Sequence, residues 1–283
     1  MKTSLLLKAL CAILGILLIF VLPVAGDDHD HDHDHDHGHG HAYEGPPAYY
    51  TAEHGDFEIG YEDGELELHI HLHAGAVVDG NALHEDTGFE PDQLTVVATE
   101  EAEILRPAGE LWEPTGVEVN EPFWVLPQHG QEGLPAYGFA TEEIPSGVFV
   151  DDVVGLNLRH IKGPGDFSLW QSDAFGVPSF ALSTHEELLS AAFPIGLHAH
   201  YNWGFTATGE YTMVFEATGE LVAGGQVEAL SVYYFKVTEE HSCIKPLAAD
   251  VNGDCRVDFL DIGHLASQWL EPHSHDHSHD HSH

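Results

Sequence analysis

Apolar and polar residues alternate over many short segments between residues 46 and 238, as in LELHIHLH, VVGLNLRHI and EYTMVFEAT. Glycine, proline and aspartate interrupt these segments about every ten to fifteen residues, as turns do between strands. This pattern predicts an all-β domain, an Ig-like β-sandwich, over residues 46–240. Only THEELLSAA, residues 184–192, has the spacing of a helix, and it predicts a short one.

The segment ELELHIHLHAG, residues 65–75, places three histidines at alternate positions. Successive side chains of a strand point to opposite faces, so these histidines share one face. Side chains two residues apart are about 6.5–7 Å apart, so two imidazoles can converge on one metal ion. The alternative is a polar, solvated face. The residues expected to face the core are Leu66, Leu68, Ile70 and Leu72, and those expected on the metal-binding face are His69, His71 and His73.

A second H-x-H pair occurs in LHAHYNWGF, where His198 and His200 share a face. Zinc binds three or four protein ligands, with Zn–N distances of about 2.0–2.1 Å. Two such pairs on neighbouring strands would supply these ligands, and His54, with Asp56 two residues later, is a further candidate. The sequence therefore predicts a zinc site in the sandwich, with the candidate ligands His54, His69, His71, His73, His198 and His200.

The first residues, MKTSLLLKALCAILGILLIFVLPVAGDD, have the pattern of a secretory signal peptide over residues 1–26. Two lysines flank the start of an apolar run, and small residues follow it at the expected cleavage site. Elsewhere the sequence has no segment with the ~20 apolar residues of a membrane-spanning helix. We therefore expect an exported protein without a membrane span after cleavage, and a secreted, periplasmic or cell-surface location.

Histidine alternates with aspartate, glycine or serine in two tracts, residues 27–45 and 272–283. These tracts lack the apolar side chains that offset the entropy cost of ordering, so we expect them to be disordered tails. Neutral imidazoles at this density bind Zn²⁺, Cu²⁺ or Ni²⁺. The candidate ligands in the tails are His29, His31, His33, His35, His37, His39, His41, His273, His275, His277, His279, His281 and His283.

The chain is strongly acidic, with 8 lysines and arginines against 48 aspartates and glutamates and a formal net charge of −40 at pH 7. This charge argues against binding to nucleic acids and to anionic membranes, whose phosphates would repel it. It suits a soluble exported protein that attracts cations.

Residues 244–271 contain DVNGDCRVDFLDIGHLASQWLE, which has the spacing of a calcium-binding loop followed by a helix. Ca²⁺ takes six to eight oxygen ligands, and oxygen-bearing side chains fall at loop positions 1, 3, 5, 9 and 12. An acidic turn before a helix is the alternative. The apolar stripe expected on the helix is Phe259, Ile262, Leu265 and Trp269. The predicted calcium ligands are Asp250, Asn252, Asp254, Asp258 and Asp261, together with the main-chain carbonyl of Arg256.

Two cysteines, Cys243 and Cys255, remain after removal of the signal peptide. An exported pair can form a disulfide, and two free thiols are the alternative. A bridge between them would close a loop of about a dozen residues and stabilise the fold by ~3 kcal/mol on the chain-entropy estimate.

Four stretches of the chain resemble a family of bacterial exported proteins that are repressed by the zinc-uptake regulator: YYTAEHGDFEIGYEDGELELHIHLH, PFWVLPQ, GPGDFSLWQSDAFGVPSFALST and HAHYNWGFTATGEYTMVFEA. This family is similar to the choice-of-anchor M surface-anchored domains, which accompany metal-uptake transporters. The resemblance covers residues 48–238 and implies a β-sandwich linked to zinc homeostasis, without catalytic activity. The histidines in the matching stretches are His54, His71, His73, His198 and His200.

The calcium-loop segment resembles a single type I dockerin repeat, whereas dockerins carry two such repeats and bind cohesin modules. The resemblance implies a surface partner of the cohesin kind or a calcium-stabilised module. This chain ends differently from the relatives that carry a sorting or transmembrane anchor, and its mode of surface attachment stays open.

Three functions are compatible with these observations. The first is a non-enzymatic protein that captures or buffers zinc, copper or nickel outside the cytoplasmic membrane and hands it to an uptake system. The second is a metalloenzyme with H-x-H ligands, but the chain has no H-E-x-x-H motif or nucleophile elbow, so we expect no enzyme. The third is a dockerin-bearing cell-surface component whose sandwich binds protein or carbohydrate. Its sugar-stacking candidates, unless they are buried, are Trp112, Trp124, Trp170 and Trp203.

Overall fold

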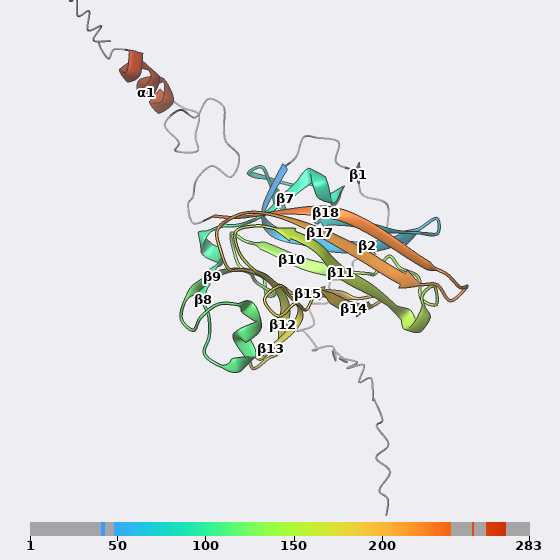
Figure 1. Ribbon diagram of the computed structural model, residues 1–283. Helices are drawn as coiled ribbons and strands as arrows, with labels where there is room; N and C mark the ends of the chain where they lie inside the picture. The colour runs from blue at the N-terminus through green and yellow to red at the C-terminus, as the bar shows by residue number, and fades with distance from the viewer. Residues whose placement is uncertain (1–40, 43–47, 239–250, 252–258, 270–283) are drawn as a thin grey trace, which may run out of the picture. The chain divides into compact units, whose positions relative to one another are not determined.

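Two β-sheets make up most of the described chain (Figure 1). The structure is a computed structural model that describes residues 41–42, 48–238, 251 and 259–269. Within these residues one sheet has 13 strands and the other has 5. This arrangement confirms the expected sandwich-like β fold, whereas the Ig-like topology stays a prediction.

The 13-stranded sheet has one main path and two short branches. Its spatial order is β1 (His41–Ala42), β6 (Thr87–Phe89), β3 (Glu65–Leu72), β2 (Ala48–Glu62), β7 (Leu94–Ala98), β18 (Gln226–Val237), β17 (Gly209–Glu220), β11 (Val153–Lys162) and β14 (Ser190–Pro194). One branch leaves β2 through β10 (Pro135–Ala140) to β15 (His198–His200), and the other through β4 (Val77–Val78) to β5 (Asn81–Ala82). Among its pairs, β1–β6, β10–β2, β18–β7 and β2–β7 are parallel, so the sheet is mixed.

The 5-stranded sheet is antiparallel in its described pairs. Its order is β13 (Pro178–Ser183), β12 (Phe167–Ser172), β16 (Asn202–Phe205), β9 (Pro122–Leu126) and β8 (Glu103–Leu105). Short 3₁₀ turns join strands at η1 (Pro91–Gln93), η2 (Glu100–Ala102), η3 (Glu110–Thr115) and η4 (Val150–Asp152). Only Tyr201 separates β15 of the larger sheet from β16 of the smaller one, so the chain crosses between the sheets at this residue.

Aromatic side chains from both sheets form the core. Trp203 of β16 is fully buried, and its ring centroid lies 6.0 Å from that of Phe57 on β2. Phe57 in turn stacks on Tyr233 of β18 at 4.4 Å. The Trp203 Nε1 donates a hydrogen bond of 2.9 Å to the carbonyl oxygen of Tyr137 on β10, so the one polar atom of the indole is satisfied inside the core.

The buried position of the tryptophans bears on the carbohydrate-binding hypothesis. Trp124, Trp170 and Trp203 expose 5%, 1% and 0% of their surface, so they pack in the interior and offer no face to a sugar. Trp112 is half-buried, and its ring meets that of Trp170 edge-on at 5.9 Å. Packing therefore accounts for these four side chains.

The short helix predicted for residues 184–192 is wrong. Residues 184–187 form a turn, and the following residues enter β14, which pairs with the edge of β11. Glu187 has a φ of 55°, in the left-handed region that a helix cannot contain. Ladder hydrogen bonds to β11 thus outweigh the local helical preference of the segment, as tertiary context often does.

Residues 259–269 form the helix α1 (Phe259–Trp269) that the calcium-loop pattern predicts. Phe259, Ile262 and Leu265, expected on one apolar stripe, are 87%, 59% and 51% exposed. Asp261 is buried, and one of its carboxylate oxygens accepts a 2.8 Å hydrogen bond from the Val251 backbone N–H. Among the described residues no helix has the length and apolar character needed to span a membrane.

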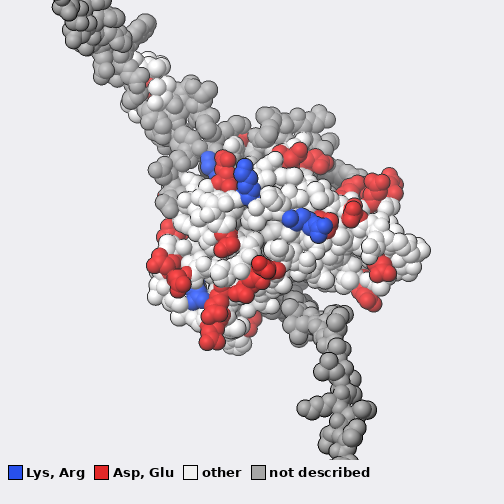
Figure 2. Space-filling model, viewed as in Figure 1, with Lys and Arg blue, Asp and Glu red and all other residues white. Residues whose placement is uncertain are grey.

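Aspartate and glutamate side chains are spread over the visible face of the molecule, whereas lysine and arginine are few (Figure 2). This distribution agrees with the composition of the whole chain. A surface of this kind raises the local concentration of cations.

Candidate metal centre

Strands β2 and β3 place two polar rows opposite each other on one face of the larger sheet. In their antiparallel register Asp56 lies opposite His71, and Glu58 lies opposite His69. His73 follows β3, and its backbone N–H donates to the His54 carbonyl at 3.1 Å. The opposite face of β3 is buried, as expected, at Leu66, Leu68, Ile70 and Leu72.

Strand β10 brings the second H-x-H pair to this face. It runs parallel to β2 with Gly138 opposite Asp56, and β15 pairs with its other edge with His200 opposite Gly138. A Cβ added at Gly138 would lie 2.1 Å from the Asp56 Oδ1, so only glycine leaves room for that carboxylate. The expectation that the two H-x-H pairs lie on neighbouring strands is wrong, because β2 and β10 separate β3 from β15.

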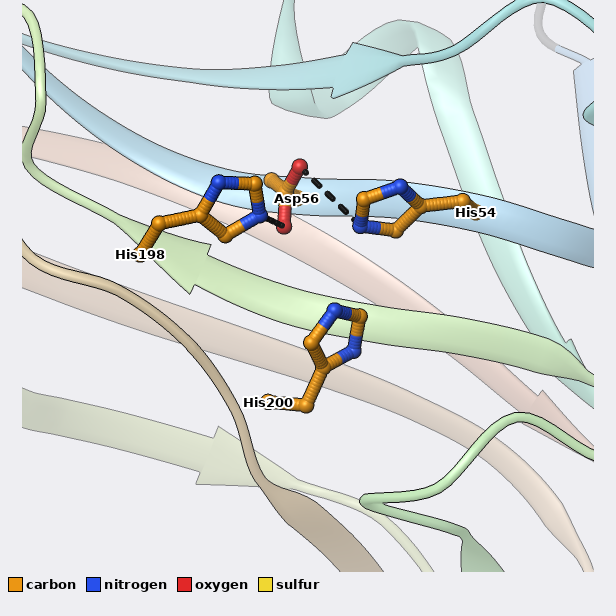
Figure 3. A group of neighbouring side chains, drawn as sticks. All are labelled: His54, Asp56, His198 and His200. Carbon is orange, nitrogen blue, oxygen red and sulfur yellow. Dashed lines mark ion pairs between the residues drawn. The ribbon is translucent and has the colours of Figure 1, made fainter. Parts of the chain in front are cut away.

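Four side chains from β2 and β15 meet across Gly138: His54, Asp56, His198 and His200. Each offers one ligand atom, and these atoms lie within 4.8 Å of one another. The His54 Nε2 is 3.5 Å from the Asp56 Oδ2, and the His198 Nε2 is 3.3 Å from the Asp56 Oδ1. Figure 3 shows the His200 ring pointing into the space between the other two rings. We call this group the first cluster.

Several polar atoms of the first cluster are buried without a hydrogen-bond partner among the described residues. They are the His54 Nε2, the His200 Nδ1 and the Asp56 Oδ1. The His198 Nε2 lies 3.3 Å from the last of these atoms, as an ion pair. Leaving one such atom unsatisfied costs about 1–3 kcal/mol. A cation that accepts lone pairs from all of them would remove that cost.

The charges of the first cluster follow from its burial and its contacts. Burial alone would raise the pKa of Asp56, but its histidine contacts outweigh burial and hold the pKa well below its usual range. Contact with Asp56 raises the pKa of His198 to about 9. Burial, together with the neighbouring imidazoles, lowers the pKa of His200 to about 4. At neutral pH the Asp56 carboxylate therefore faces a protonated His198, and His200 is ready as a neutral ligand.

A second cluster adjoins the first and consists of His71, His73 and Asp86. The Asp86 Oδ2 is 3.9 Å from the His71 Nε2 and 3.7 Å from the His73 Nδ1. The other nitrogen of His73 is hydrogen-bonded to the Asp56 Oδ2 at 3.1 Å, which joins the two clusters. The His71 and His73 rings stack with centroids 4.9 Å apart.

A third cluster contains Glu58, His69 and Glu143. The His69 Nε2 lies 3.2 Å from the Glu58 Oε2 and 3.7 Å from the Glu143 Oε2. Burial opposes protonation of this histidine, but the two carboxylates outweigh burial and raise its pKa to about 10. Burial would raise the pKa of Glu58, but its contacts with His69 and His71 outweigh burial and lower that pKa to about 2. In the metal-free protein this cluster is therefore a satisfied ion-pair triad.

The structure thus distributes the six histidines predicted for the sandwich over three adjoining clusters. Four carboxylates accompany these histidines. Of these, the sequence pointed only to Asp56, as a neighbour of His54, whereas Glu58, Asp86 and Glu143 were not predicted. Alternation along β2 is the signal that could have indicated Glu58 too, because Asp56 and Glu58 flank the core residue Phe57. Asp86 and Glu143 lie outside the strands, and no local pattern indicates them.

Most of the predicted tail and calcium ligands lie outside the described residues. Of the tails, only the backbone of His41 is described, and it pairs with Thr87 in the two-residue strand β1. Of the calcium loop, Asp261 is described. The predicted residues outside the described ranges are His29, His31, His33, His35, His37, His39, His273, His275, His277, His279, His281, His283, Asp250, Asn252, Asp254, Arg256, Asp258, Cys243 and Cys255.

Fold and site together define a β-sheet protein with histidine–carboxylate clusters, compatible with a bound metal ion, on one face of its larger sheet. No family model, curated protein or solved structure matches this chain.

Proposed function

We propose that this protein is an exported zinc-binding protein that holds one ion at the first cluster. The observation that carries the proposal is the convergence of three imidazoles and the buried Asp56 within 4.8 Å. Zinc prefers a tetrahedral set of nitrogen and oxygen ligands. Ligand atoms at Zn–N distances of about 2.0–2.1 Å lie roughly 3.4 Å apart, so the histidines close inward slightly when zinc binds.

The ligand count favours binding over catalysis. Four protein ligands fill a tetrahedral shell, whereas a catalytic zinc keeps one position open for water or substrate. We therefore propose storage or transfer of the ion and no enzymatic activity. Imidazole donors also select transition metals over Ca²⁺ and Mg²⁺, so copper and nickel are the competitors of zinc at this cluster.

The proposed role is capture of zinc outside the cytoplasmic membrane and delivery to a metal-uptake system. The histidine-rich tract precedes β1 in the chain, and β1 is separated from the ligand strand β3 only by β6. In this proposal the imidazoles of the tract take up ions first, and the clusters then hold them. The resemblance to exported proteins under the zinc-uptake regulator supports the same role.

We further propose that residues 250–261 bind calcium and that the segment around them acts as a dockerin-like surface module. The buried carboxylate of Asp261 supports this, because it accepts a hydrogen bond from the backbone N–H of Val251, the residue that follows the first predicted ligand. A cohesin-like surface protein is the proposed partner of this module. Chelation of calcium should reduce the helical circular dichroism of the chain and leave its β signal unchanged.

The zinc proposal is tested on the full chain, purified without an added histidine tag and saturated with Ca²⁺. Zinc per chain is measured by elemental analysis after equilibration with a zinc-buffering chelator. The double variant His198→Ala/His200→Ala should hold about one zinc fewer than the wild type. His160→Ala is the matched control, since this exposed histidine of β11 belongs to none of the clusters. Equal zinc content in all three proteins would refute the site.

A further inference from the structure

The second cluster has the features of a metal position of its own. The buried His71 Nε2 has no hydrogen-bond partner among the described residues. It faces the Asp86 Oδ2 at 3.9 Å, and the same oxygen is 3.7 Å from the His73 Nδ1. Two imidazole nitrogens and a carboxylate oxygen therefore converge on one point. The hydrogen bonds of these three residues use their other polar atoms.

The remaining ring nitrogens of these two histidines are held by the carboxylates of β2. The His73 Nε2 donates to the Asp56 Oδ2 at 3.1 Å, and the His71 Nδ1 faces the Glu58 Oε2 at 3.6 Å. Metal-bound histidines characteristically donate their second ring N–H to a carboxylate, which fixes the ring and makes it a stronger ligand. His73 already has this arrangement, and the Glu58 carboxylate lies 3.6 Å from the second ring nitrogen of His71.

We infer that the sandwich binds two adjoining divalent transition-metal ions, the second held by the His71 Nε2, the His73 Nδ1 and Asp86. This inference deepens the proposed function and rests on it. Asp56 links the two positions, because it is a ligand of the first ion and the hydrogen-bond partner of a histidine that binds the second. The third cluster is not a metal position by the same criterion, since the His69 Nε2 faces two carboxylates and no buried atom of the cluster lacks a partner.

The two positions differ in how far they are open to water. The carboxylate of the first, Asp56, is 3% exposed, whereas that of the second, Asp86, is 51% exposed. Three protein ligands also leave a tetrahedral ion one position for water or for a ligand from another molecule. The second ion should therefore be held more weakly and exchange more readily, as suits a position through which metal enters and leaves.

The test counts zinc in the full chain at two buffered zinc concentrations, one that fills only the tighter position and one that fills both. Asp86→Asn removes the charged ligand but keeps the oxygen that accepts the Ala74 N–H at 2.7 Å. His71→Gln is the second variant and guards against a failure to fold. Glu228→Gln, an exposed carboxylate of β18, is the matched control.

At the higher zinc concentration, Asp86→Asn and His71→Gln should each hold about one zinc ion per chain fewer than Glu228→Gln. At the lower zinc concentration, all three variants should hold the same amount of zinc per chain. Combining Asp86→Asn with His198→Ala/His200→Ala should lower the zinc content by about two ions per chain at the higher concentration. If only the His198/His200 variant loses zinc, the second position is refuted and the proposed function stands. If the His198/His200 variant loses none while Asp86→Asn loses one, the pair of positions and the proposed function both fail.

Discussion

Gly138 offers the sharpest test of the first cluster, because a single added methyl group there reaches one ligand. A Cβ at this position would lie 2.1 Å from the Asp56 Oδ1, whereas ordinary van der Waals contact begins at 3.4 Å. The carboxylate must therefore retreat by roughly 1 Å in Gly138→Ala. Metal–ligand distances in proteins tolerate deviations of only about ±0.2 Å. Asp56 can then no longer bind an ion held by the three histidines.

The size of the effect follows from the lost ligand. Removing even an outer hydrogen-bond partner of a metal site costs about 10–100-fold in affinity, so loss of a direct ligand should cost about 100-fold or more. A 100-fold loss corresponds to about 2.8 kcal/mol. With zinc in excess over both dissociation constants, the stabilisation by zinc falls by the same amount. For a domain of this size that is about 6–11 °C in the melting temperature.

The assay is thermal unfolding of the full chain with and without zinc. The difference between the two midpoints removes any effect of the methyl group on the metal-free protein. Zinc bound equally by the folded and unfolded chain does not contribute to this difference. Gly88→Ala on β6 is the control, because a Cβ there meets no atom within 4 Å. If zinc shifts the midpoint of Gly138→Ala as much as that of Gly88→Ala, Asp56 is not a ligand and the reasoning fails.

Three further predictions concern protons and packing. Zinc binding near pH 7 should release protons, since contact with Asp56 raises the pKa of His198 to about 9 and zinc binds the neutral ring. Calorimetry in two buffers with different ionisation enthalpies measures this proton release, and equal heats of binding in both buffers would contradict it. In the metal-free protein, burial of Glu58 is outweighed by its histidine contacts and its pKa falls from 4.5 to about 2, so its stabilising contribution is present above pH 4.5 and is lost as the pH falls towards 2. Urea unfolding of wild type and Glu58→Gln should therefore differ near pH 6 and converge in acid; a constant difference would refute the assignment. Trp203→Ala should lower the free energy of unfolding by about 3–5 kcal/mol, because the ring is fully buried; a urea titration that gives less than about 1 kcal/mol would show that the core tolerates the cavity.

Local alternation was enough to predict the strands and the faces of β3. Leu68 and Ile70 point inward and His69 and His71 outward, as a period of two requires. The helix prediction for residues 184–192 was wrong because the edge of β11 provides a pairing partner that no local pattern indicates. Local preference is a weak guide when a long-range ladder competes with it.

The composition of the clusters was less predictable than their histidines. Asp56 meets His198 only because β10 lies between their strands and carries glycine at the crossing. That contact depends on the register of three strands that are distant in the sequence. An isolated glycine in PAYGFA has many explanations, and close approach of a carboxylate becomes evident only when the neighbouring strand is known.

The strand β2 ties the stability of the core to the geometry of the metal centre. Phe57 stacks on Tyr233 inside the sandwich, while its neighbours Asp56 and Glu58 point to the opposite face and contact the histidines. A slip of one residue in the pairing of β2 with β3 would place both carboxylates in the core and Phe57 among the histidines. The aromatic packing that selects the register therefore also sets the positions of the ligands. Core substitutions that loosen β2 should for this reason weaken zinc binding without touching any ligand.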